Sequence, residues 1–216
     1  DHVARIERRS LSPAADRARD YWDRRLPDLP LGPDLPLARV PSDIRNARFD
    51  RVQTRLDAAS RARVGAIARA QGLTESAFLM ALYARTLAVW SANPDFCLTV
   101  TLFSRDSAGP DMAGVIGDFT SILPLEIRCG DAPDMATLAR RTQDRLWQDL
   151  DHNALSGIEV LARLNAREGT HGRALAPYVF TSGLGTGGSY LDAFSRFGRI
   201  VDAAVQTPQL LIDHQA

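Results

Sequence analysis

Four short blocks of the sequence carry polar side chains that ordinary strand or loop packing does not require. They are LPDLPLGPDLPL at 26–37, GDFTSILPLE at 117–126, YVFTSGL at 178–184 and QTPQLLID at 206–213. All of the last three contain hydroxyl groups, the second and the fourth block contain carboxyl groups, and the fourth also contains side-chain amides. A carboxyl held beside a hydroxyl can transfer or orient protons. These blocks are therefore the first candidates for a functional site.

Two further patterns match known motifs by spacing, but neither is expected to form a catalytic or a nucleotide-binding site. Asp106 and Asp111 have the spacing DxxxxD, yet they lie in DSAGPD, whose Gly and Pro favour a turn with solvated carboxylates. GLGTGG at 183–188 matches the dinucleotide pattern GxGxxG. A dinucleotide site also needs a substantial helix and an acidic residue about twenty positions later, whereas only the short SYLDAFSRF follows. We expect no nucleotide site here.

The cysteines and histidines show no metal-binding pattern. Cys97 and Cys129 lie in apolar, strand-like runs, which favours buried free thiols over a disulfide and leaves a catalytic thiol as the alternative. The four histidines are scattered in the sequence, and we expect them on the surface or in loops: His2, His152, His171 and His214.

The composition indicates a globular chain with no strong electrostatic preference. Of 216 residues, 45% are hydrophobic, and 26 basic residues, all arginine, balance 26 acidic ones. This balance gives no basis for binding nucleic acid or an anionic membrane. No run approaches the roughly 18 to 20 apolar residues of a membrane span, and the start of the chain lacks a secretory signal, so we expect a cytoplasmic protein.

Helices and strands are expected to alternate along the chain. Capping residues and apolar spacing predict helices that start after Ser12, Asp57, Thr74 and Ser156, with a further long helix at 135–150. The helix after Thr74 is apolar nearly all round and should be buried. The proline-rich stretch between 26 and 42 should be an extended segment lying over a surface.

Strands are predicted at 52–56, 95–104, 120–127, 177–182 and 206–213. Pro124 removes a backbone donor and indicates an edge strand or a bulge. Alternation in the last strand should place Gln209, Leu211 and Asp213 on one face. Strands separated by helices predict an α/β fold, a mixed sheet with helices packed on it.

In their order along the chain, the four blocks resemble conserved motifs of heterocyclization domains, a branch of the condensation-domain family of nonribosomal peptide synthetases. The resemblance implies a chloramphenicol-acetyltransferase-like lobe, one of two that form a V around a substrate tunnel. It covers the second, C-terminal lobe, which would occupy 48–216 and be incomplete at its C-terminus, with the first helix and the proline-rich segment at 1–47 leading into it. The aspartate pair of the first lobe, DxxxxD, would lie upstream of residue 1.

The resemblance also implies residue roles. Asp213 and Thr181 occupy the positions that the family uses for cyclodehydration, and Asp213 needs a partly desolvated setting to donate a proton at neutral pH. Other polar residues of the blocks would position substrate, although for Asp118 a structural role in the loop is preferred: Gln209, Gln206, Ser182, Asp118 and Thr120. The chain reads LTVTLFSR where many relatives resemble LNLTLFNR, so Thr99 and Ser104 replace asparagines and cyclization could be altered.

The implied reaction joins a carrier-bound acyl donor to carrier-bound Cys, Ser or Thr and then closes a thiazoline or oxazoline ring. No cofactor is bound directly, because substrates ride on the phosphopantetheine arms of donor and acceptor carrier proteins. The other implied partners are the upstream lobe and an adjacent adenylation domain. Two alternatives stay open: condensation without ring closure, and a noncatalytic lobe that only docks carrier proteins.

Overall fold

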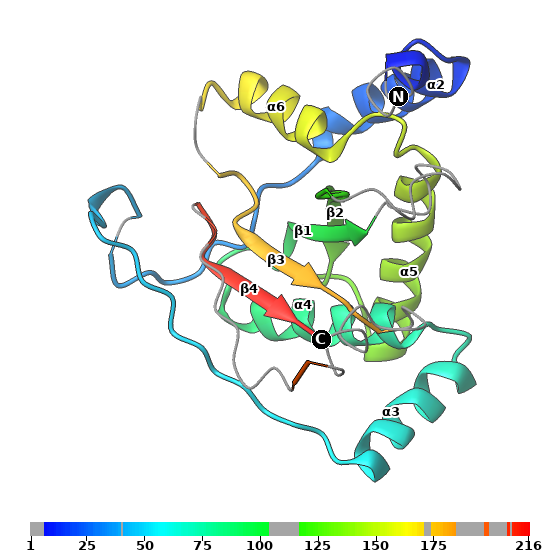
Figure 1. Cartoon of the computed structure of the whole chain (residues 1–216), viewed down its shortest axis with the longest axis vertical. Coiled ribbons are helices and arrows are strands. Elements are labelled where there is room, and N and C mark those ends of the chain that lie inside the picture. Colours follow the sequence, from blue (N-terminus) through cyan, green and yellow to red (C-terminus); the bar gives the residue numbers. More distant parts are fainter. Residues whose placement is uncertain are drawn as a thin grey trace.

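The computed structural model describes residues 7–39, 41–103, 117–170, 174–184, 197–198, 207 and 209–216. A four-stranded sheet in the order β2-β1-β3-β4 lies at the centre (Figure 1). Its strands are β1 (Asp95–Phe103), β2 (Thr120–Arg128), β3 (Tyr178–Thr181) and β4 (Ile212–Gln215). β2 runs antiparallel to β1, whereas β1, β3 and β4 run parallel to one another. The predicted mixed sheet is confirmed.

Strand pairing places apolar side chains of β1 and β2 in the core. Leu98 lies opposite Leu125 and Val100 opposite Leu123, and all four are buried. Pro124 of β2 lies opposite Thr99 of β1, and β2 is an edge strand of the described sheet. The edge position predicted from this proline is therefore confirmed.

Five helices begin at a capping side chain that accepts a backbone hydrogen bond, which satisfies an otherwise unpaired N–H. They are α2 (Pro13–Arg25), α3 (Ala58–Ala70), α4 (Glu75–Trp90), α5 (Met135–Asp151) and α6 (Gly157–Glu168). Their caps are Ser12, Asp57, Thr74, Asp134 and Ser156. Four of these caps were predicted from the sequence, and positive φ angles at Gly72 and Gly169 follow the ends of α3 and α6.

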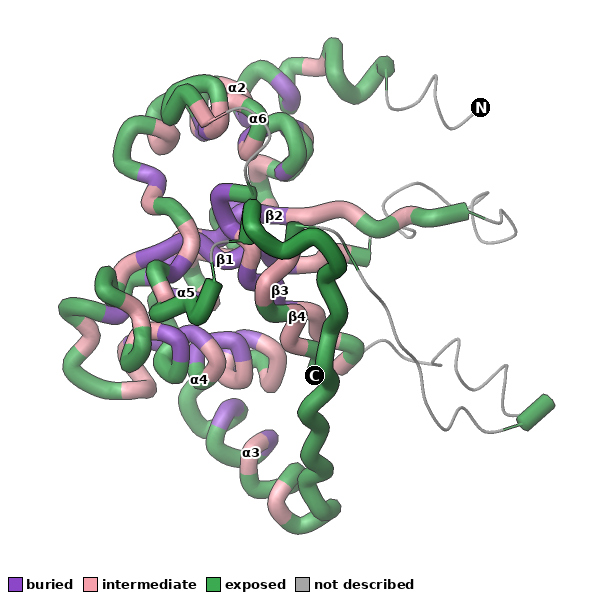
Figure 2. The backbone as a smooth tube through the Cα atoms, turned by 90° about the vertical axis from the view of Figure 1, so that its left-hand side faces the viewer, coloured by how far each residue is buried: buried purple, intermediate pink, exposed green. Residues whose placement is uncertain are grey.

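One hydrophobic core joins the helices to the sheet. Trp22 of α2, Met80 of α4, Leu138 of α5 and Leu164 of α6 belong to the same buried cluster as Phe180 of β3. Figure 2 shows the buried positions gathered around the sheet and the sides of the helices that meet it. Helix α2 is thus part of this core, although it is far from the strands in sequence.

The proline-rich segment is extended and hydrogen-bonded to the body of the protein. It begins with a short 3-10 helix, η1 (Leu26–Asp28). The Leu31 carbonyl then accepts from the Cys97 amide at 2.8 Å, and the Gly32 amide donates to the Leu175 carbonyl at 2.7 Å. The segment therefore lies along the starts of β1 and β3, as the prediction of a surface-lying segment required.

The strand predicted at 52–56 is wrong. After η2 (Pro41–Asp43), the chain runs without regular structure to α3, and Val52 is 99% exposed. Figure 2 shows this stretch as a continuous exposed run. Alternation of apolar and polar residues is not sufficient for a strand, because a strand also needs a partner, and none of the described strands pairs with this one.

Helix α4 is buried along one side only. Ala77, Met80 and Ala84 are fully covered, but Val89 is 74% exposed and Trp90 67% exposed. The prediction of a wholly buried helix is therefore wrong for its C-terminal turns. Among the described residues, no helix is long and apolar enough to cross a membrane.

Both cysteines are free and buried, as predicted. Burial raises the pKa of the Cys129 thiol to about 11 and raises that of Cys97 as well. Thiols with raised pKa values are poor nucleophiles at neutral pH, which weakens the catalytic-thiol alternative.

Candidate active site

Three of the four sequence blocks contribute residues to strands of the sheet. β1, β3 and β4 run parallel and end on the same side, where the antiparallel strand β2 begins (Figure 1). Thr120 at the start of β2 and Thr181 at the end of β3 therefore lie at this end of the sheet. Asp213 is the second residue of β4 and lies opposite Val179, two residues back from this end. The block at 26–37 lies instead along the starts of β1 and β3.

Thr181 is the last residue of β3 and is half-buried. Its hydroxyl donates a hydrogen bond to the Thr101 hydroxyl oxygen of β1 at 2.8 Å. The backbone beyond the strand continues the parallel pairing, because the Ala216 amide donates to the Thr181 carbonyl at 2.9 Å. The hydroxyl is thus held on a defined face of the sheet.

Asp213 lies on the same face as Thr181. In the parallel pair of β3 and β4, Asp213 lies opposite Val179 and shares its face. Val179 precedes Thr181 by two residues, and residues two apart in a strand point to the same face, so Asp213 and Thr181 share that face. Its Oδ2 accepts from the Gln215 amide nitrogen at 2.9 Å. Its Oδ1 is buried and has no hydrogen-bond partner among the described residues. One carboxylate oxygen is thus oriented by the protein while the other is shielded from solvent.

Gln209 does not share a strand face with Asp213, so that prediction is wrong. β4 begins only at Ile212, and Gln209 lies in a turn with a φ of 70° and an exposed side chain. The left-handed conformation interrupts the extended backbone on which the alternation argument depended. Gln206 lies outside the described residues.

Ser182 links the end of β3 to the first turn of α4. Its hydroxyl and that of Ser76 are hydrogen-bonded at 2.7 Å, and it also accepts from the Leu184 amide at 3.3 Å. These contacts give Ser182 a clear structural function, and its predicted role toward substrate stays a prediction.

Asp118 and Thr120 form a turn at the start of β2. The Asp118 carboxylate accepts from the Thr120 amide at 2.8 Å, and hydrogen bonding to Thr120 lowers the pKa of this exposed carboxyl. The contact matches the loop-fixing role preferred for Asp118 from the sequence. Whether either side chain also contacts substrate stays a prediction.

Thr99 replaces one of the asparagines of the similar motif and has a structural partner here. It is 5% exposed, and its hydroxyl donates to the Ala176 carbonyl at 2.8 Å. The Ser104 position, the Asp106 and Asp111 pair and most of the GLGTGG segment lie outside the described residues.

An aromatic cluster behind Asp213 was missed by the sequence analysis. The His214 ring stacks on Tyr83 of α4 at 4.6 Å and on Phe180 of β3 at 5.3 Å, measured between ring centroids. Burial lowers the pKa of His214 and raises that of Tyr83, so both rings are neutral at neutral pH. His214 is therefore a strand residue in a packed cluster and not a surface histidine. The sequence offered one indication that His214 lies in a strand: it directly follows Asp213 at the end of an alternating run.

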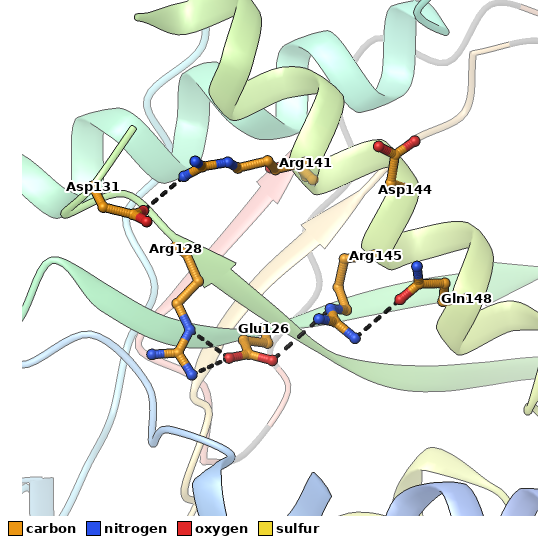
Figure 3. A pocket seen from close by; sticks show the side chains of 8 residues that line it. Glu126, Arg128, Asp131, Arg141, Asp144, Arg145 and Gln148 are labelled. Atoms are coloured by element: carbon orange, nitrogen blue, oxygen red, sulfur yellow. Dashed lines mark hydrogen bonds and ion pairs between the residues drawn. The ribbon is translucent and has the colours of Figure 1, made fainter. Parts of the chain in front are cut away.

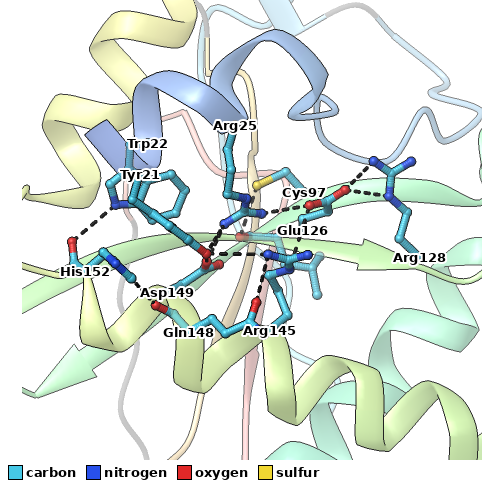
Figure 4. Close-up of polar contacts among 11 residues, drawn as sticks. Tyr21, Trp22, Arg25, Cys97, Glu126, Arg128, Arg145, Gln148, Asp149 and His152 are labelled. Atoms are coloured by element: carbon cyan, nitrogen blue, oxygen red, sulfur yellow. Dashed lines mark hydrogen bonds and ion pairs between the residues drawn. The ribbon is translucent and has the colours of Figure 1, made fainter. Parts of the chain in front are cut away.

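A second missed feature is a charged cluster between α2, α5 and β2 (Figure 4). Asp149 of α5 is fully buried, and its Oδ1 accepts from the Tyr21 hydroxyl at 2.5 Å and from the Arg25 guanidinium. Arg25 also donates to Glu126 of β2 at 2.7 Å. Burial raises the pKa of Asp149 to about 6, although Arg25 and Tyr21 act in the opposite direction. Nearby, the His152 ring stacks on Tyr21 at 3.8 Å, so it too is packed rather than free on the surface.

A shallow pocket of about 330 Å³ lies beside this cluster on the surface of α5 and β2 (Figure 3). Its arginines are neutralised by neighbours: Arg141 bonds Asp131 at 2.7 Å, and Arg128 pairs with Glu126. The pocket therefore presents a mixture of charges without a net preference for an anion. The charged cluster is a structural clamp that joins α2 to the sheet, and it is remote in the fold from Thr181.

Three comparisons with known proteins all give matches. The family model described as "Condensation domain" matches residues 1–180. The pyochelin synthetase PchF of Pseudomonas aeruginosa is 43% identical over 188 residues, which is 86% of this chain and 10% of that protein. The phenyloxazoline synthase MbtB of a Mycobacterium species is 38% identical over 205 residues, 94% of this chain and 17% of that protein.

Among solved structures, the cyclization-docking bidomain of the nonribosomal peptide synthetase EpoB from Sorangium cellulosum superimposes with a TM-score of 0.87 at 36% identity. The match covers 100% of this chain and 43% of that chain. The chain thus spans a small part of these curated relatives and under half of the solved bidomain. The fold is the chloramphenicol-acetyltransferase-like lobe expected from the motifs. The chain belongs to the condensation-domain family of nonribosomal peptide synthetases, in its heterocyclization branch.

Proposed function

We propose that this chain is the second lobe of a heterocyclization domain that condenses a carrier-bound acyl donor with carrier-bound Cys, Ser or Thr and then closes a thiazoline or oxazoline ring. The placement of Asp213 and Thr181 on one face of the sheet, in the neighbouring strands β4 and β3, carries the proposal. Two similar proteins support the proposal, since one is named a phenyloxazoline synthase and the other contains a cyclization domain.

Ring closure requires two proton transfers that these side chains can assist. The acceptor thiol or hydroxyl loses its proton and attacks the new amide carbonyl, which forms a carbon–sulfur or carbon–oxygen bond and a tetrahedral adduct. The adduct then loses its hydroxyl as water while the nitrogen gives up its proton and a C=N bond forms. Asp213 accepts the first proton and returns it to the former carbonyl oxygen, which becomes the hydroxyl of the adduct. It then transfers the proton of the nitrogen to this hydroxyl, which leaves as water; such proton transfers commonly contribute about a hundredfold or more.

Thr181 has the complementary role of orienting the adduct. Its hydroxyl can both donate and accept, and Thr101 already fixes its position. The unpartnered Oδ1 of Asp213 is the atom free to receive a proton. The proposed roles therefore use one neutral hydroxyl and one carboxylate oxygen on the same sheet face.

The proposed partners follow from this reaction. Donor and acceptor carrier proteins present both substrates on phosphopantetheine arms, an adjacent adenylation domain supplies the cyclized residue, and the first lobe contributes the aspartate pair DxxxxD. The chain itself binds no cofactor, and the assembly works in the cytoplasm. Gln206, Gln209, Ser182, Asp118 and Thr120 are the proposed substrate-positioning residues.

The test is a single turnover of the synthetase that contains this chain, with both carriers loaded and the product followed by intact mass. Ring formation removes one water beyond the amide, so the expected product is lighter than the linear amide by that amount. A linear amide as the end product would establish condensation without ring closure. No amide at all, with carriers still bound, would establish a docking lobe.

A further inference from the structure

Within the part of the sheet that the structure describes, β4 is a short edge strand that pairs with β3. It has four residues, of which Ile212 is 38% exposed and Gln215 is exposed. Asp213 faces the proposed reaction side of the sheet. His214 is thus the residue of β4 whose side chain joins the strand to the packed interior on the other face.

The geometry of His214 is that of an inserted ring. It lies nearly parallel to Phe180, with 10° between the ring planes, and at 29° to Tyr83. These two rings come from strand β3, with which all of β4 pairs, and from helix α4, so the imidazole links the strand to the helix as well as to its neighbour in the sheet. A flat, neutral ring suits this place, since stacked aromatic rings attract one another beyond the effect of the area that they bury.

Adjacent residues of one strand share a backbone while pointing to opposite faces, so a shift of His214 moves Asp213. We propose that His214 is the positioning residue for Asp213: its ring, stacked against Phe180 and Tyr83, fixes strand β4 so that the carboxylate meets the tetrahedral adduct. This inference rests on the proposed ring-closing function. His214 does not contact the reacting atoms, because it lies on the opposite face.

The contribution expected from such positioning is substantial. A displacement of about 1 Å of a reacting group can cost on the order of a hundredfold in rate. Amide formation should be far less affected, because Asp213 is proposed to act only in the later, dehydrating step. The signature of the positioning role is therefore a changed partition between linear amide and ring, and not a uniform loss of product.

The experiment compares variants of the full synthetase by the ratio of ring to linear amide in a single turnover. His214→Ala removes the stack and should lower ring closure by about tenfold or more while the amide still forms. His214→Phe keeps a flat ring and should restore closure to within about threefold of the parent. His152→Ala is the matched control, because it removes a histidine stacked on Tyr21 away from Asp213 and should leave the partition unchanged.

A second pair of variants probes the stack from the helix side, which keeps the test valid if His214→Ala does not fold. Tyr83→Leu should shift the partition toward linear amide, and Tyr83→Phe should not. A parent enzyme that makes no ring would refute the proposed function itself. A parent that makes the ring, together with disrupted stacks that still give the parental partition or that lose amide and ring equally, would overturn the positioning role of His214.

Discussion

The proposed roles of Asp213 and Thr181 predict different losses of ring closure when each side chain is removed. In the full synthetase, Asp213→Ala should slow cyclodehydration by about a hundredfold to ten-thousandfold, so that the linear amide accumulates on the carrier. Thr181→Ala should slow it by only about threefold to tenfold, since a neutral hydrogen bond contributes about 1 kcal/mol and water can replace a hydroxyl. Mass spectrometry of the carrier measures both.

Conservative variants provide the controls for this pair. Thr181→Ser keeps the hydroxyl and should behave as the parent, whereas Asp213→Asn keeps the shape but not the proton acceptor and should resemble Asp213→Ala. Loss of the amide in a folded Asp213→Ala variant, or ring closure at the parental rate, would show that the carboxylate does not serve the dehydrating step.

Asp149 should make the stability of the protein depend on pH. Its pKa of about 6 lies above the ordinary value of 3.8, so between these values the native state binds more protons than the unfolded state. The contribution of this group to the free energy of unfolding therefore falls as pH rises from about 4 to 7, by an amount on the order of 3 kcal/mol. Urea unfolding at pH 5 and pH 7.5 measures the slope.

Asp149→Asn should remove this slope, although it also weakens the clamp by taking one partner from Arg25. Asp144→Asn, on the exposed surface of the same helix, is the matched control and should keep the parental pH dependence. Equal slopes in the parent and in Asp149→Asn would mean that the buried carboxyl does not titrate in this range.

At the scale of elements, the contact between α6 and β2 depends on a missing side chain. A Cβ added at Gly157 would lie 2.0 Å from the Ile122 carbonyl oxygen and 3.0 Å from the Pro124 ring. The backbone cannot yield cheaply there, so Gly157→Ala should destabilise the protein by about 1 to 3 kcal/mol. Thermal or urea unfolding measures the loss.

The other end of α6 supplies the comparison for Gly157. Gly169 has a φ of 63° with no atoms near an added Cβ, so Gly169→Ala should cost about 1 to 2 kcal/mol through the backbone alone. A Gly157→Ala variant as stable as the parent would contradict the close packing of α6 on β2.

Local signals in the sequence were sufficient for the helices and insufficient for β4 and the clamp. Ser12, Thr74 and Ser156 marked helix starts correctly, because a cap and its target amide are neighbours in the chain. The start of β4 was missed because the left-handed turn at Gln209 has no distinctive residue type. The link from Arg25 to Asp149 spans 124 positions, and no spacing rule reaches that far.

For the candidate site, the sequence indicated which residues to consider but not how they are arranged. The motif blocks named Asp213 and Thr181, and the parallel register of β3 and β4 then placed them on one face. The role of His214 depends on rings from two other elements, so it became visible only in three dimensions.

At the scale of the whole molecule, this chain should form no heterocycle by itself. It covers 43% of the EpoB bidomain, and the resemblance assigns the catalytic aspartate pair to the other lobe. The purified chain mixed with both loaded carriers should therefore give neither amide nor ring, whereas the full synthetase gives both. Intact-mass measurement of the carriers decides this, and ring formation by the chain alone would refute the two-lobe account.

The clamp between α2 and α5 has a consequence for the time course of synthesis. Arg25 is made 124 residues before Asp149, so at about 5 to 20 residues per second it waits about 6 to 25 seconds on the ribosome for its partner. A helix of 13 residues is marginal on its own in water. Helix α2 therefore emerges long before the groups that bury Trp22 and pair Arg25, and during that interval its apolar side is available to chaperones.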